Sequence, residues 1–394
     1  MKLLAQHTLN GYGGMGEGMA LQKKGDRRVL WLAHESAPKN FTAVDVTDPR
    51  KPRVIVQTDL PHAKMRSNSL EVSGDLMAVA YQVAHFGLKP AGFELFDISD
   101  PERPKSISHF DASGPHSRGC HALWFVDGET VHMACSDPDL KPRNLKDDQV
   151  YRIVDVRNPA KPVAVGGWHL PGTMEGDDAP APRRLPAQFD AGFRAHNTNV
   201  YPSRPDRCYL GYLDGGMMVL DISDRSRPKL ISRWTNSPPY NGFTHTVLPL
   251  FERGLLVVTD ESIQDDGADW PKLVWLVDAR DEKNLVSIGT LPVSGVKPLL
   301  HAGGRCGAHN LHENAPGAWR SEDIVLGTFF NAGVRAYDIR DPYAPREVAY
   351  FIPPAPQGAP AGTAQINDVF VDDRGIVFAV DRHAGGLYIL EMTL

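Results

Sequence analysis

The segment MMVLDISDRSRPKLI, residues 217–231, recurs along the chain with the same order of apolar, acidic and turn-forming residues. The copies are spaced at roughly 50–65 residues, a period typical of repeat architectures. The other copies are FTAVDVTDPRKPRVI (41–55), FELFDISDPERPKSI (93–107), YRIVDVRNPAKPVAV (151–165), VWLVDARDEKNLVSI (274–288), VRAYDIRDPYAPREV (334–348) and the shortened GLYILEMTL (386–394). Since each copy is one unit of the same kind, the repeat decides the fold.

Each copy predicts a strand, a tight turn and a second strand. β-branched and aromatic residues favour the strands, and the Asp-Pro-x-x-Pro motif is typical of a turn. The acidic residue that ends the first strand is expected to accept backbone N–H bonds across that turn. These residues are Asp45, Asp97, Asp155, Asp221, Asp278, Asp338 and Glu391. The fifth copy has DEKN at 281–284 instead of the proline motif, so its turn is expected to be built differently.

Two further short strands precede each copy, such as HALWFV (121–126) and TVHMAC (130–135) before the third. Four antiparallel strands per unit make a propeller blade. The last copy lacks its fourth strand, and the N-terminal KLLAQHTL (2–9) resembles the corresponding KLISRWTN (229–236). Pairing the two would close the ring and hide both edge strands. We therefore expect one all-β domain over residues 1–394, a closed seven-bladed propeller, with six or eight blades left open as alternative counts.

The repeated phrase also carries a family resemblance. Segments such as MMVLDISD, FELFDISD and YRIVDVRN resemble the repeat of the LVIVD-repeat β-propeller family, and the resemblance covers essentially the whole chain. It implies the propeller fold. It implies little about activity, because propellers host enzymes and scaffolds alike.

Composition limits the classes of partner. The chain of 394 residues is 42% hydrophobic and 23% charged, with a net charge of −6 and mixed signs throughout, which disfavours nucleic acid. No apolar run reaches the roughly 18 residues needed to cross a bilayer, and the N-terminus lacks a secretory pattern. The four cysteines lack CxxC spacing and are interpreted as reduced thiols, so a cytoplasmic protein is expected.

Histidines recur at one position of the repeat, the start of the innermost strand. Aligning the seven units there gives Glu17, Asn68, His121, His196, His245, His309 and Asn367. Because innermost strands surround the channel, side chains at this position are expected to converge on its axis. Polar residues there can simply hydrate the channel. Four neutral imidazoles, however, have few donors for one another, and four charged ones repel, whereas one bound cation resolves both problems.

The predicted cofactor is therefore one divalent transition metal held by four histidines. Imidazole ligands suit Zn, Fe or Mn, and also Cu, and disfavour Ca and Mg, which prefer oxygen. An ion at the mouth of a channel with one open face is typical of catalysis. Glu17 is expected to reach the ion or its bound water, or to orient a ligand imidazole.

Further side chains are predicted around this centre. Glu17 and Glu261 are the candidate catalytic acids or bases. Loops on the same face carry His34 and His383 as candidate substrate-binding residues, beside Glu35 and Asp381. Each of these side chains could equally cap a turn or stay solvated.

Three arginines, Arg118, Arg194 and Arg305, shortly precede the histidines. Arg118 and Arg194 are the candidate clamps for a substrate carboxylate. Pairing of these arginines with Glu17, Glu261 or Asp190 is the alternative. The segment 171–193, rich in proline and charge, is interpreted as a lid over the channel mouth or as a surface excursion.

Three functions fit these residues. The first is a metal-dependent enzyme of hydrolase or lyase type, acting on a small organic and carboxylate-bearing substrate. The second is a non-haem iron oxygenase, because four histidines in a seven-bladed propeller are similar to the ligand arrangement of the carotenoid-cleaving oxygenases. The third is a non-catalytic binding scaffold.

Overall fold

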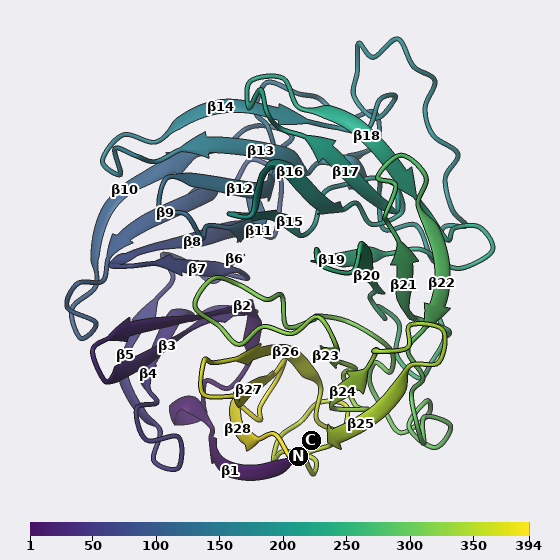
Figure 1. The fold of residues 1–394 in the computed structure, drawn as a ribbon. Coiled ribbons are helices and arrows are strands. Elements are labelled where there is room, and N and C mark those ends of the chain that lie inside the picture. Colours follow the sequence, from purple (N-terminus) through teal and green to yellow (C-terminus); the bar gives the residue numbers. More distant parts are fainter. Residues whose placement is uncertain (394) are drawn as a thin grey trace.

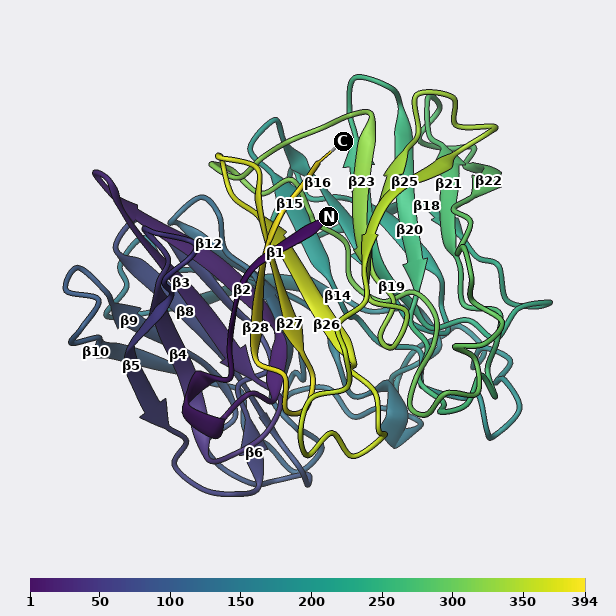
Figure 2. The same ribbon diagram turned by 90° about the horizontal axis from the view of Figure 1, so that it is seen from below.

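The computed structural model describes residues 1–393 as a ring of seven antiparallel sheets, seen along its axis in Figure 1 and turned by 90° in Figure 2. Blades 1 to 3, from the innermost strand outward, contain β2 (Met15–Lys24), β3 (Arg27–His34), β4 (Lys39–Asp45) and β5 (Arg53–Asp59); β6 (Met65–Arg66) with β7 (Leu70–Ser73), β8 (Leu76–Val83), β9 (Gly92–Asp97) and β10 (Lys105–Asp111); and β11 (Cys120–Trp124), β12 (Thr130–Cys135), β13 (Val150–Asp155) and β14 (Val163–Trp168).

Blades 4 to 7 contain β15 (Thr198–Tyr201), β16 (Arg204–Gly211), β17 (Met217–Asp221) and β18 (Lys229–Trp234); β19 (Thr244–Leu250), β20 (Leu255–Asp260), β21 (Val274–Asp278) and β22 (Val286–Thr290); β23 (Ile324–Thr328), β24 (Val334–Asp338) and β25 (Arg346–Phe351); and β26 (Ile366–Val371), β27 (Ile376–Asp381), β28 (Leu387–Glu391) and β1 (Lys2–His7). Two 3₁₀ turns, Leu9–Gly11 and Leu145–Asp147, are the helical elements within the described residues. No helix in the described part of the chain is long and apolar enough to span a membrane.

The ring closes as the sequence predicts. Strand β1 pairs antiparallel with β28, and Lys2 lies opposite Glu391, so the two ends of the chain meet on one blade (Figure 1). This pairing covers an edge that would otherwise present free N–H and C=O groups. The seven-bladed, N-terminally closed propeller is confirmed.

Blade 6 departs from four regular strands. Its innermost segment forms only isolated bridges, although the His309 N–H donates to Thr328 O and the Thr328 N–H to Asn310 O, both at 2.9 Å. The segment therefore takes the place of an innermost strand and carries His309 into the channel.

The repeated turns are built alike. The Thr47 N–H donates to Asp45 Oδ1 at 3.1 Å, and the Arg280 N–H of the fifth copy donates to Asp278 Oδ1 at the same distance. The expectation that the fifth turn differs was wrong, because these bonds need the aspartate and not the prolines. Glu282, which replaces a proline there, accepts hydrogen bonds from Arg204 and Arg207 of blade 4 instead.

The hydrophobic core lies between neighbouring blades. Phe41 of blade 1 meets Phe96 of blade 2 edge to face, with ring centroids 5.2 Å apart, and Trp234 of blade 4 meets Trp275 of blade 5 in the same way at 5.5 Å. Such pairs add to the area that each sheet buries. All four cysteines are buried and free. Packing between the sheets fixes the innermost strands around the channel and so positions the histidines.

Candidate metal centre

The four aligned histidines come together in the channel. The ring centroids of His121 and His196 lie 4.4 Å apart, those of His196 and His245 3.8 Å, and those of His245 and His309 4.5 Å. All four side chains are buried. The structure thus brings the predicted ligands together from four successive blades, whereas their role as metal ligands stays a prediction.

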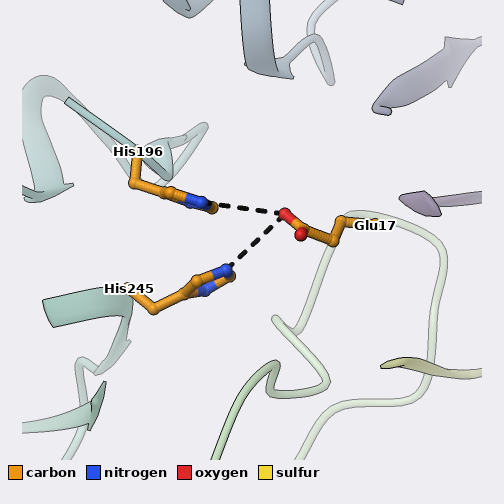
Figure 3. Close-up of side chains that lie close together, drawn as sticks. All are labelled: Glu17, His196 and His245. Atoms are coloured by element: carbon orange, nitrogen blue, oxygen red, sulfur yellow. Dashed lines mark ion pairs between the residues drawn. The ribbon is translucent and has the colours of Figure 1, made fainter. Parts of the chain in front are cut away.

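The four Nε2 atoms face the carboxylate of Glu17. They lie 3.6 Å (His121), 3.8 Å (His196) and 3.5 Å (His245) from Oε2, and 3.5 Å (His309) from Oε1. Figure 3 shows Glu17 reaching between His196 and His245 from the opposite side of the channel. Five potential ligand groups therefore face one small space.

Outward hydrogen bonds orient two of the rings. His309 Nδ1 lies 2.7 Å from the backbone carbonyl of Asn367, which can only accept, so the proton sits on Nδ1 and the Nε2 lone pair faces inward. His196 Nδ1 lies 2.8 Å from Asn197 Oδ1. The amide of Asn197 is fixed in turn, because its Nδ2 donates to Glu313 Oε1 at 2.8 Å. Such outer contacts typically orient metal-binding imidazoles.

The other two rings are held by side chains. His245 Nδ1 lies 2.8 Å from the hydroxyl of Thr246. His121 Nδ1 lies 3.0 Å from Gln82 Oε1 and 3.2 Å from Arg66 Nη2. Every ring therefore has its Nδ1 engaged and its Nε2 directed at the channel.

Several inward atoms lack hydrogen-bond partners. Glu17 Oε2, His245 Nε2 and His309 Nε2 are buried and unpaired within the described structure. His121 Nε2 and His196 Nε2 lie 2.7 Å apart, so one shared proton satisfies that pair alone. Unpaired buried polar atoms are costly. A cation bound by these nitrogens and by Glu17 satisfies all of them at once.

Burial keeps the imidazoles in the form that binds metal. It lowers the pKa of His121, of His245 and, more strongly, of His196 below the ordinary histidine value. Burial alone would raise the pKa of Glu17, but the surrounding histidines hold that pKa well below its usual range. Neutral nitrogens around one carboxylate anion are a donor set suited to a divalent transition metal.

Two glycines bring Glu17 to the axis. A Cβ on Gly16 would lie 2.5 Å from Asn68 O, and one on Gly18 would lie 2.2 Å from Leu70 N. Strand β2 therefore approaches the innermost segment of blade 2 more closely than a side chain would allow, and the Glu17 N–H donates to Asn68 O at 2.7 Å. Any larger residue at 16 or 18 would displace the carboxylate.

Glu261 completes a second group that could hold an ion. Its Oε1 lies 3.6 Å from His309 Nε2 and its Oε2 lies 3.8 Å from His245 Nε2. Oε1 also accepts a hydrogen bond from Arg305 Nη1 at 2.7 Å. Burial opposes ionisation, but the nearby histidines and Arg305 lower the pKa of Glu261. The structure thus places both candidate catalytic carboxylates, Glu17 and Glu261, at the centre.

A cavity of about 370 Å³ opens over the centre, which we call the front cavity. Glu17, Glu261, His121 and His196 line it, together with Arg66, Arg118, Arg194, Arg305 and Arg382. The two candidate carboxylate clamps thus lie at this opening. Arg118, however, already donates to Asp148 through Nε at 2.9 Å and Nη2 at 2.7 Å. The sequence had offered Glu17, Glu261 and Asp190 as alternative partners of this arginine. Asp148 lies 30 positions from Arg118, so the spacing along the chain could not identify it.

The remaining candidates lie apart from the front cavity. His34 does not line it: the side chain is buried, Nε2 lies 2.8 Å from the Thr42 hydroxyl, and burial lowers the pKa to about 4. His383 is exposed on the loop after β27, next to Arg382. His34 therefore has a structural contact, which does not favour the predicted substrate role.

The segment 171–193 ends at the front cavity. Asp190 and Ala191 contribute to its lining. Arg184 ties the segment down by donating to both Asp147 and Asp190 at 2.6–2.7 Å. The end of the segment thus lies at the mouth, and both interpretations, a lid and a surface excursion, stay open.

A second cavity, of about 250 Å³, reaches Glu17 from the other end of the channel, and we call it the rear cavity. Three acids that the sequence analysis did not single out line it: Glu71, Glu313 and Asp368. Burial raises the pKa of each, most strongly for Glu71 and Asp368, whose pKa the charge of Glu313 raises further. They follow the aligned positions Asn68, His309 and Asn367 by one to four residues, a recurrence that could have revealed them.

Comparison with known proteins agrees with this geometry. Residues 208–236, one copy of the repeated phrase, match the family model described as the LVIVD repeat. The closed ring of seven sheets supplies the architecture that the repeat implies. The chain is a β-propeller that contains an LVIVD repeat. No curated protein matches its sequence.

Solved structures similar to this propeller share its fold at low identity. The β-propeller domain of Cps50 (Swd1) from Myceliophteria thermophila has a TM-score of 0.60 at 15% identity, covering 100% of this chain and 99% of that one. Raptor from Chaetomium thermophilum also gives 0.60, at 13% identity, covering 100% of this chain but 29% of that one. A chain of the Mitotic Checkpoint Complex gives 0.55 at 10% identity, covering 100% and 94%. Such identities show the fold alone.

Proposed function

We propose that this protein is a metal-dependent enzyme that acts on a small organic substrate at the four-histidine centre, by hydrolysis or lyase-type cleavage. One observation carries the proposal: His245 Nε2, His309 Nε2 and Glu17 Oε2 are buried, face one another and have no hydrogen-bond partner among the described residues. The nitrogen-rich donor set favours one divalent transition metal, Zn, Fe or Mn.

The roles of the residues follow from their positions. His121, His196, His245 and His309 would hold the ion through Nε2, and Glu17 would complete its surroundings or bind its water. The ion would supply Lewis-acid chemistry or an activated water. Glu261, fixed by Arg305 and within 4 Å of two histidines, is placed to accept or donate a proton on the front side.

Two other functions are alternatives. Four imidazoles without sulfur ligands also suit iron, which would favour an oxygenase. A non-catalytic, protein-binding scaffold is the other, since one of the similar solved structures is titled as a checkpoint complex. A scaffold, however, gives no reason for the unpaired nitrogens in the channel.

Elemental analysis of the purified protein tests the proposal. We expect one equivalent of transition metal in the parent protein, and loss of that metal in His196→Ala and His245→Ala with the fold retained. His301→Ala, at an exposed position, is the matched control. Zn or Mn would favour hydrolysis or elimination, and Fe would favour oxygen chemistry. Trace metal in the parent, after growth in supplemented medium, would leave the scaffold as the better account.

A further inference from the structure

We infer that the substrate carries an oxyanion group, a carboxylate or a phosphate, which binds Arg194 beside the metal centre. The inference rests on the proposed function and names the chemical class of its substrate. It rests on a difference among the five arginines that line the front cavity: four of them donate hydrogen bonds to other residues, whereas the side chain of Arg194 donates none to any described residue.

Four of the five guanidinium groups are already bound by protein acceptors. Arg118 donates twice to Asp148, and Arg305 donates to Glu261. Glu35 accepts hydrogen bonds from both Arg66 and Arg382. Two of these arginines make a further hydrogen bond. Arg66 Nε donates to Gln82 Oε1 at 2.8 Å, and Arg382 Nη1 donates to Asn367 Oδ1 at 3.1 Å. These four arginines shape the wall of the cavity.

Arg194 is different. It makes no hydrogen bond with any described residue, and its Nε is buried without a partner. The nearest carboxylate oxygen, Asp148 Oδ1, lies 3.7 Å from Nη1 and already accepts from Arg118 at 2.7 Å. The side chain is 20% exposed, but its buried Nε lacks an acceptor, which is costly, so this position is suited to a ligand that brings one.

The surroundings point to an anion. Arg66, Arg118 and Arg194 line both the front cavity and an adjoining cavity of about 350 Å³, which also contains Lys64. Glu35 and Asp148 already accept hydrogen bonds from Arg66 and Arg118, so a neutral acceptor would leave the charge of Arg194 without a carboxylate of its own. A carboxylate or phosphate supplies both oxygen acceptors and negative charge, and its geometry matches the guanidinium fork.

The anion position also suits the chemistry. His121, one of the four histidines of the centre, lines the same cavity as Arg194. A substrate held by its oxyanion at Arg194 would thus present an adjoining bond to the open face of the centre. Contacts to a group away from the reacting bond commonly orient a substrate in an active site.

Calorimetric titration with inorganic phosphate and, separately, with acetate tests the inference on the protein as purified. We expect at least one of the two anions to bind the parent, and Arg194→Gln to weaken that binding at least about tenfold, the loss of roughly 1.4 kcal/mol from one charge-assisted pair. Arg157→Gln, at an exposed turn arginine that pairs with Asp155, is the control and should bind like the parent. Preference for phosphate or for acetate identifies which oxyanion the site takes.

Arg194→Lys keeps the charge and loses the fork, so it should bind with intermediate affinity and serves if Arg194→Gln fails to fold. Unchanged affinity in both variants, or no binding of either anion to the parent at millimolar concentration, would overturn the inference. Metal content, measured on the same samples, separates the two proposals. Stoichiometric metal without Arg194-dependent binding refutes the anion site alone, and Arg194-dependent binding without metal refutes the proposed function alone.

Discussion

The two ends of the channel differ in charge although the same innermost strands build both. The front cavity is lined by five arginines, and the rear cavity carries Glu71, Glu313 and Asp368. Glu17 lines both and is the point where they meet. The front end is therefore suited to anions, whereas burial raises the pKa of the three rear acids, so the rear end is suited to holding protons.

The difference between the front and rear cavities shows how one repeated unit can build a site whose two ends are unlike. Residues two apart on a strand share a face, whereas each step along the innermost strand also moves along the channel axis. His309 and Glu313 come from one segment, yet the first faces the ion site and the second lines the rear cavity. Small offsets within the same strand thus separate a nitrogen-rich centre from a carboxylate-rich opening.

The largest effect is expected where the two ends meet. Glu17→Gln keeps the shape and removes the charge that faces four Nε2 atoms, so we expect affinity for Zn²⁺ to fall at least about a hundredfold, in line with the cost of losing one member of a buried charge pair. Competition with a chromophoric chelator measures it. Glu129→Gln, at an exposed glutamate, is the control. Parent-like affinity in Glu17→Gln would remove the carboxylate from the centre.

A smaller effect is expected on the pH dependence of thermal stability, through Asp368 in the rear cavity. Burial raises the pKa of Asp368, so the folded protein keeps a proton that the unfolded chain releases above about pH 4. Stability contributed by this group is therefore present at low pH and is lost as pH rises toward the raised pKa. Asp368→Asn should melt close to the parent at pH 4–5 and above it at pH 8, by roughly 1 °C per kcal/mol for a chain of this length. A difference in melting temperature that does not change with pH would contradict this reading of the rear cavity.

The smallest effect is expected from Glu313, which lines the rear cavity and contacts the histidine centre through Asn197. Glu313 fixes the Asn197 amide, which orients His196. Glu313→Gln can turn its own amide nitrogen toward Asn197 and disturb that arrangement, so we expect metal affinity to fall about tenfold, as for other outer contacts. The chelator competition reads this out, with Glu129→Gln again as control. Equal affinities for parent and variant would show that His196 is oriented without Glu313.

The fold and the ligand cluster could be predicted because both are periodic. The repeated Asp-turn phrase fixed the order of the strands, and alignment of the repeat brought His121, His196, His245 and His309 to one level. Contacts that cross between loops have no such period. The pairing of Arg118 with Asp148 and the burial of His34 against Thr42 depend on loop paths that spacing does not encode.

The turn of the fifth copy is the opposite case, in which the sequence departs from the motif but the local structure does not. Its sequence departs from the motif, but Asp278 alone makes the bonds that shape it. Glu282 then replaces a proline and gains a contact with a neighbouring blade that only the closed ring brings near. The unusual residue in the fifth copy, Glu282, therefore makes a contact between blades and does not change the turn.

Anomalous X-ray diffraction from crystals of the purified protein, recorded at the absorption edge of the metal found by elemental analysis, tests the four-histidine centre most directly. The account predicts one strong peak in the channel, about 2.0–2.2 Å from the Nε2 atoms of His121, His196, His245 and His309. A channel without an anomalous peak, or a peak bound elsewhere while these four nitrogens contact only water, would contradict it.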